Sequence, residues 1–126
     1  MICIRLKNEI KARLGDYKID GNKDELCNVI CTDSLVKISL NDVLSVLSDE
    51  NTNYIRIGYG QTLHSAYNAG GVVGKTCKLV HIYSYPGKIK FKVLYNFINS
   101  INNDIIFGYS EDDLMSPGVK LVMIFN

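Results

Sequence analysis

The sequence lacks three features that would point to a functional class at once. It has no strong net charge, since 14 Lys and Arg residues stand against 13 Asp and Glu residues. A balance of +1 gives no electrostatic reason to expect nucleic acid as a partner. No apolar run approaches the length of a membrane span, and Arg5 and Lys7 interrupt the N-terminus too early for a secretory signal. These absences predict a cytoplasmic protein.

The four cysteines lack the pattern of a disulfide framework. They lie in segments rich in Ile, Val and Leu: Cys3, Cys27, Cys31 and Cys77. This setting favours reduced, buried thiols in a cytosolic protein. A zinc site built from Cys27 and Cys31 with His64 or His81 is disfavoured, because zinc sites prefer closer cysteine pairs, as in C-x2-C. We therefore expect no metal and no cofactor.

The length and composition fit a single globular domain. The chain has 126 residues, of which 47% are hydrophobic and 21% are charged. This size is sufficient for a hydrophobic core without disulfide or metal crosslinks, and this composition is not that of a disordered chain.

The N-terminal segment carries apolar residues at four-residue steps. Ile2, Leu6, Ile10 and Leu14 occupy these steps, with basic residues between them, which predicts an amphipathic helix over residues 2–14 that stops at Gly15. Alternating apolar residues leave a short strand at the very start as an alternative. We expect the helix to pack on the core or to meet a partner rather than a membrane surface.

The remaining patterns predict an α/β fold. Helices are expected within residues 26–31, 40–47, part of 61–69 and 91–101, and strands at 54–60, 77–85, 105–108 and 119–125. Ser39 is the expected N-cap of the second of these helices, with Asp42 in its first turn. This order predicts a two-layer sandwich in which helices cover a four-stranded mixed sheet. Residues 1–23 are expected to form a helix and a polar linker, and residues 24–126 the domain.

A glycine-rich stretch at residues 69–76, AGGVVGKT, satisfies a relaxed phosphate-binding-loop pattern. In a working loop, the backbone N–H groups of the loop, which includes Gly74, wrap phosphates, Lys75 binds them and Thr76 holds magnesium. Such a loop needs a strand before it and a helix starting at its Lys-Thr pair. Here the following segment has the composition of a strand, so we interpret the stretch as a flexible loop and not as a nucleotide site.

Several stretches, taken in order, resemble the C-terminal domain of FtsZ, the bacterial tubulin homologue. Residues 28–43, NVICTDSLVKISLNDV, resemble the end of the family's long central helix and the loop after it. Further similar segments are 44–60, which ends in Gly-x-Gly, then 79–87, 91–101 and 106–115. The order and spacing match over residues 24–126, except at 61–76, where the family usually has a longer helical insertion.

The resemblance implies a role for the loop before the second helix. In FtsZ this loop enters the nucleotide site of the next subunit, where acidic residues of an Asn-x-Asp-x-x-Asp pattern help to activate water for GTP hydrolysis. The corresponding positions here are Lys37, Ser39 and Asp42, so only Asp42 keeps its type. A lysine and a hydroxyl do not reproduce two acidic groups, so we expect no GTPase activation. Lys37 favours contact with a phosphate or an acidic surface. The chain has no room for the family's GTPase domain, so GTP binding in cis is not expected.

Three functions remain open from the sequence. The first is a non-catalytic protein that binds a filament-forming partner such as FtsZ through Lys37, Ser39, Asn41 and Asp42 and caps its polymerisation in cell division. The ordinary alternative for these residues is helix capping and a solvated lysine. The second function is a small enzyme, with candidate groups His64, His81, Tyr59, Tyr83, Cys77 and Asp112. The third is a self-assembling module or homodimer, which pairs through the N-terminal helix or through a sheet edge at Tyr54, Ile55 and Ile57.

Overall fold

The computed structural model describes residues 2–115 and 118–126, and the side chains from Ile4 onward. The sheet has the strand order β1-β2-β5-β3-β4. The strands are β1 (Ile19–Asp20), β2 (Asn53–Gly60), β3 (Cys77–Ser84), β4 (Ile106–Glu111) and β5 (Val119–Phe125). β5 is antiparallel to both of its neighbours, whereas β3 and β4 are parallel to each other. The sheet is therefore mixed, and the predicted α/β sandwich class is confirmed.

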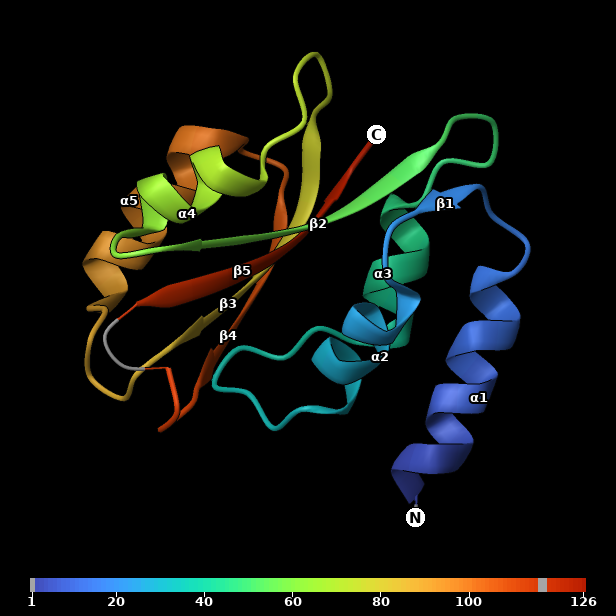
Figure 1. Ribbon diagram of the computed structural model, residues 1–126, viewed down its shortest axis with the longest axis horizontal. Coiled ribbons are helices and arrows are strands. Elements are labelled where there is room, and N and C mark those ends of the chain that lie inside the picture. The colour runs from blue at the N-terminus through green and yellow to red at the C-terminus, as the bar shows by residue number, and fades with distance from the viewer. Residues whose placement is uncertain (1, 116–117) are drawn as a thin grey trace.

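The helices cover both faces of the sheet. They are α1 (Ile2–Leu14), α2 (Lys23–Cys31), α3 (Leu40–Val46), α4 (Leu63–Gly70) and α5 (Phe91–Ile101). Figure 1 shows α4 and α5 on one side of the sheet and α1, α2 and α3 on the other. Two buried clusters correspond to these two sides. The first cluster contains Leu79 and Val122, and the second contains Ile82 and Leu121. Because both of its faces are covered, β5 reads VKLVMIF with almost no alternation of polar residues.

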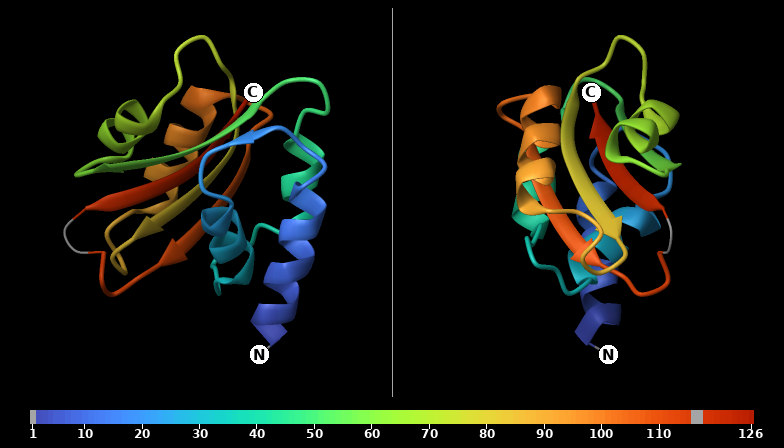
Figure 2. Two further views of the ribbon diagram at one scale, coloured as in Figure 1. Left: turned by 45° about the vertical axis from the view of Figure 1, so that its right-hand side comes forward. Right: turned by 90° about the vertical axis from the view of Figure 1, so that its left-hand side faces the viewer.

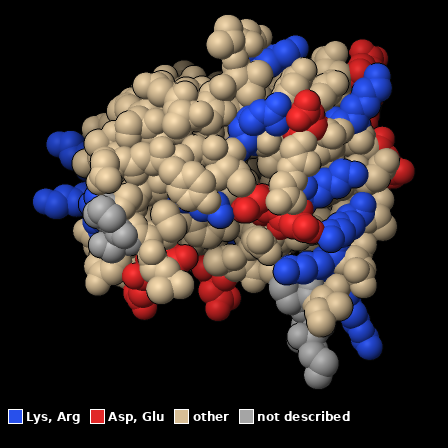
Figure 3. Space-filling view, in the orientation of Figure 1, with Lys and Arg blue, Asp and Glu red and all other residues tan. Residues whose placement is uncertain are grey.

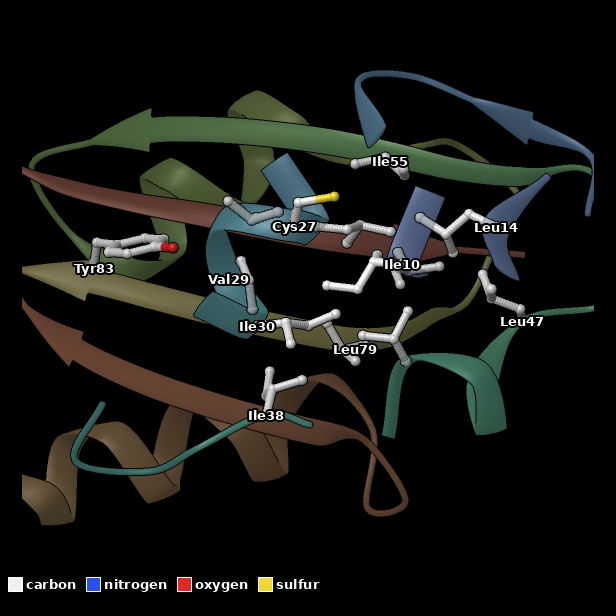
Figure 4. Close-up of a cluster of buried hydrophobic side chains, with 14 residues drawn as sticks. Ile10, Leu14, Cys27, Val29, Ile30, Ile38, Leu47, Ile55, Leu79 and Tyr83 are labelled. Carbon is white, nitrogen blue, oxygen red and sulfur yellow. The ribbon is translucent and has the colours of Figure 1, made fainter. Parts of the chain in front are cut away.

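The N-terminal helix is built into the first cluster. Ile10 and Leu14 are fully buried and pack with residues of α2 and with Ile55 and Leu79 (Figure 4). The alternative of a short strand at the start is therefore wrong, and core packing is one use of this helix. The division into segments 1–23 and 24–126 stays a prediction.

Two details of the sheet differ from the sequence prediction. The expected polar linker contains β1, whose Ile19 and Asp20 pair with Asn53 and Tyr54 of β2, so the described sheet has five strands instead of four. A two-residue strand is too short to leave an alternating pattern in the sequence. β1 also covers the first part of β2, so Tyr54 does not form the exposed edge that was considered.

The last pair of strands brings a second correction. β4 was expected to stop at Gly108, yet it continues to Glu111. Gly108 pairs with His81 of β3, and a Cβ atom at this glycine would lie only 2.7 Å from Ile38 Cγ1 and would also overlap the His81 ring. The glycine thus marks a close approach inside the strand rather than its end.

Candidate functional site

The loop between α2 and α3 contains the four residues proposed for partner binding. It is fastened to the edge of the sheet by Val36, which forms an antiparallel bridge with Tyr109 of β4. The backbone N–H of Val36 donates to the Tyr109 carbonyl oxygen at 3.2 Å, and the Tyr109 N–H donates back at 2.9 Å. Ile38, two residues on, is fully buried in the first cluster (Figure 4). The loop is therefore held at both positions and presents its polar residues from a fixed backbone.

Lys37 is used inside the protein, and it is not a freely solvated side chain. Its ammonium group donates to the carbonyl oxygens of Ile30 and of Thr32, the latter at 2.9 Å. These carbonyls belong to the C-terminal end of α2, where the helix dipole favours a positive charge. Lys37 thereby ties the loop to α2.

Ser39 and Asp42 form a capping box at the start of α3. The Ser39 hydroxyl accepts a hydrogen bond from the Asp42 N–H at 3.1 Å, and the Asp42 carboxylate accepts one from the Ser39 N–H at 2.9 Å. The predicted N-cap is thus confirmed. Asn41 lies between them and is exposed. Of the four residues, Asn41 is the one whose replacement leaves these internal contacts intact.

The capping box makes a direct prediction about stability. Replacing Ser39 with Ala removes the acceptor for the Asp42 N–H and is expected to lower the free energy of unfolding by about 1 kcal/mol. Urea unfolding followed by circular dichroism measures this change. Ser45→Ala serves as the control, since its hydroxyl donates to the Asp42 carbonyl oxygen within the helix and is exposed. Equal stability of Ser39→Ala and the wild type would contradict the capping role.

A chain of polar side chains, not found by sequence reasoning, connects the loop to buried residues of the sheet. The Ser34 and Ser110 hydroxyls are 2.8 Å apart, and the Ser110 hydroxyl is 2.7 Å from His81 Nε2. His81 is fully buried, and its Nδ1 has no hydrogen-bond partner among the described residues. Burial, with a smaller contribution from the Lys37 charge, lowers the pKa of His81 to about 4. His81 is therefore neutral at pH 7, as expected for a core histidine.

The groups considered for an enzyme are divided between the two faces of the sheet. The rings of His81 and Tyr83 are neighbours, with centroids 4.7 Å apart, and Tyr83 lies in the first cluster. Cys77 lies in the second cluster, on the other face of the sheet, and burial raises the pKa of its thiol to about 12. A thiol with this pKa is protonated and unreactive at neutral pH. His64 stacks edge-on against Phe97 of α5, at 5.2 Å between ring centroids.

The other sequence candidates occupy ordinary positions. The glycine-rich stretch joins α4 to β3, an order of helix, loop and strand that is the reverse of what a phosphate-binding loop needs. Cys27 and Cys77 are buried, as predicted, whereas Cys31 is partly exposed, and the Cys3 side chain lies outside the described residues. Within the described ranges, no group of three or more His, Cys, Asp or Glu side chains is placed to hold a metal ion. Nor is any helix there long and apolar enough to cross a membrane.

Comparison with known proteins identifies the fold. No protein-family model matches the chain, and neither does any curated protein. Among solved structures, a mutant FtsZ from M. jannaschii (W319Y) superimposes with a TM-score of 0.62 at 16% sequence identity, over 98% of this chain and 52% of that one. An FtsZ dimer from M. jannaschii, described as empty, gives 0.61 at 17% identity, over 79% and 34%. The chain therefore spans between one third and about one half of these FtsZ chains, and its fold is that of the FtsZ/tubulin C-terminal domain.

Proposed function

We propose that this protein is a non-catalytic, FtsZ-like domain that binds a filament-forming GTPase of the FtsZ type and limits its polymerisation. The observation that carries the proposal is the loop between α2 and α3. The resemblance assigns contact with the next subunit to this loop, and the loop's backbone is held by the Val36–Tyr109 bridge, by Lys37 and by the capping box. A preorganised loop loses little conformational entropy on binding.

The same contacts support a partner-binding role without catalysis. Lys37 and Ser39 replace the acidic or amide groups of the family pattern, and the Asp42 carboxylate accepts the hydrogen bond from the Ser39 N–H. Asp42 is therefore the single carboxylate among these three residues, and one carboxylate does not replace the two acidic groups of the family pattern. A subunit that presents this loop at a filament end, but does not activate hydrolysis, would occupy the end and slow its turnover.

The binding surface is tested by co-sedimentation with polymers of FtsZ from the same cell. Asn41→Glu places a negative charge on the exposed residue 41. We expect this charge to weaken binding about tenfold, because it is repelled by the anionic nucleotide on the partner's binding surface. A glutamate in the first turn of α3 is compatible with the helix dipole, so the fold is retained.

The matched control is Asn99→Glu, an exposed asparagine on α5, on the opposite face of the sheet. It makes the same chemical change and is expected to leave binding unaltered. The proposal fails if the wild-type protein does not pellet with the polymer, or if both variants bind as the wild type does.

A further inference from the structure

The face of the sheet opposite the loop carries a pocket between α4 and α5. Both helices begin at the same end of this face, and Figure 2 shows them side by side over the sheet. The pocket has a volume of about 670 Å³ and reaches from the first turn of α4 to the segment before α5. Its floor is formed by Leu63, Phe97 and Val119, which are buried. Pockets of several hundred cubic ångströms with an apolar floor are typical of small-molecule sites.

The walls and the rim of this pocket differ in character. Ile89 and Val93 extend the apolar floor, and Val93 is 53% exposed although it is a large hydrophobic residue. Lys88 and Lys90 line the rim. The lining contains no acidic residue, and within the described part of the chain neither lysine takes part in an ion pair. Glu111 reaches the neighbouring turn, where its carboxylate accepts a hydrogen bond from the Gly87 N–H at 2.8 Å.

The beginning of α5 adds to the positive character of the rim. Lys90 is its N-cap and provides no side-chain hydrogen bond to the first turn, which also contains no acidic residue. The free N–H groups of this turn and the two ammonium groups therefore lie at one side of an apolar pocket. The surroundings are otherwise low in charge, since residues 61–74 contain no charged side chain, and the surface over α4 in Figure 3 is correspondingly uncharged.

We propose that the pocket between α4 and α5 binds a small amphiphilic anion, with a single carboxylate or phosphate group at Lys88 and Lys90 and a hydrocarbon or aromatic body on Leu63 and Phe97. The apolar floor contributes little binding free energy to a purely polar anion, and the lysines contribute little to a neutral hydrocarbon. Only a ligand with both parts removes apolar surface from water and also pairs the two cations. The site is independent of the partner-binding loop, which lies on the other face of the sheet.

The proposal is tested on the protein alone by ¹H–¹⁵N NMR titration with octanoate, octyl phosphate and octanol. Octanoate or octyl phosphate is expected to give saturable shifts of the Leu63, Val93 and Phe97 amides, and the stronger of the two identifies the head group. The double variant Lys88→Ala/Lys90→Ala is expected to weaken binding at least about tenfold, which is the scale of one charge-assisted hydrogen bond.

Lys92→Ala is the matched control, because Lys92 is in the same turn but does not line the pocket. It is expected to bind the anions as the wild type does. Three results would overturn the proposal: shifts scattered over distant exposed apolar residues such as Ile4, octanol binding as tightly as the two anions, or undiminished anion binding by the double variant.

Discussion

Lowering the pH from 7 to 5 is expected to reduce the free energy of unfolding by about 2 kcal/mol through His81 alone. The imidazole is fully buried, hydrogen-bonded to Ser110 through Nε2, and has no described partner at Nδ1. Burial and the nearby Lys37 charge lower its pKa from 6.5 to about 4. Burial and the Lys37 charge both disfavour a positive charge on the His81 imidazole.

The direction of the effect follows from this lowered pKa. Between pH 6.5 and pH 4 the unfolded chain takes up a proton at His81 that the folded protein does not, so acid favours the unfolded state. The contribution of neutral His81 to the free energy of unfolding is fully present above pH 6.5 and decreases as the pH falls. Below pH 4 it is lost, and the total loss of unfolding free energy is about 3 kcal/mol.

Urea unfolding at pH 7, 6 and 5 measures this dependence, and His81→Gln is the comparison that isolates it. The glutamine amide can occupy the position of Nε2 and bond to Ser110, but it does not titrate. We expect the variant to lose its stability less steeply between pH 7 and pH 5, with a difference from the wild type of about 2 kcal/mol. Parallel pH profiles for the two proteins would show that His81 is not the group responsible.

Gly108→Ala is expected to lower the free energy of unfolding by about 2 kcal/mol, because the added methyl group has no space. Its Cβ would lie 2.7 Å from Ile38 Cγ1 and 2.9 Å from the Cε1 atom of His81, and closer still to Nδ1. His81 would have to rotate away from Ser110, and Ile38, the buried residue of the loop, would have to move out of the first cluster. The substitution should therefore also loosen the α2–α3 connection.

Urea unfolding and hydrogen exchange at the Val36 and Tyr109 amides measure the two parts of this prediction. Gly71→Ala is the control, since Gly71 ends α4 with a φ of −66°, and the nearest atom to an added Cβ there is the Tyr67 carbonyl oxygen at 3.3 Å. We expect that change to stay within about 0.5 kcal/mol of the wild type. A Gly108→Ala protein as stable as the control, with unchanged exchange, would contradict the close packing.

Much of the fold could be predicted from periodic patterns in the sequence. The four-residue spacing of apolar residues such as Ile10 and Leu14 predicted the first helix, and the N-cap pattern of Ser39 and Asp42 predicted the start of α3. α4 was harder to predict, because its residues are small and polar. Its start is fixed by a capping box in which the Thr62 and Ser65 side chains each accept from the other's backbone N–H. β1 was not predicted, because a strand of two residues is too short to show an alternation of apolar and polar side chains.

The candidate site was predictable only in part. The sequence order located the loop, but it did not show that Lys37 is bound to carbonyl groups of α2, since that contact depends on how the chain turns at Thr32. The Ser34–Ser110 contact joins residues that are 76 positions apart, so no local pattern could indicate it. Gly108, within an apolar strand, was the one available signal of a close backbone approach, and it was interpreted instead as the end of the strand.

The most direct test of the proposed function is a sedimentation assay of FtsZ from the same cell with GTP, in which this protein is added at increasing sub-stoichiometric ratios. If the protein limits polymerisation through the loop between α2 and α3, the polymer mass will fall at ratios well below one to one. About ten times more of the Asn41→Glu variant will be needed for the same loss of polymer. An undiminished polymer mass at every ratio, with none of this protein in the pellet, would contradict the account and leave an FtsZ-like fold that serves a different assembly.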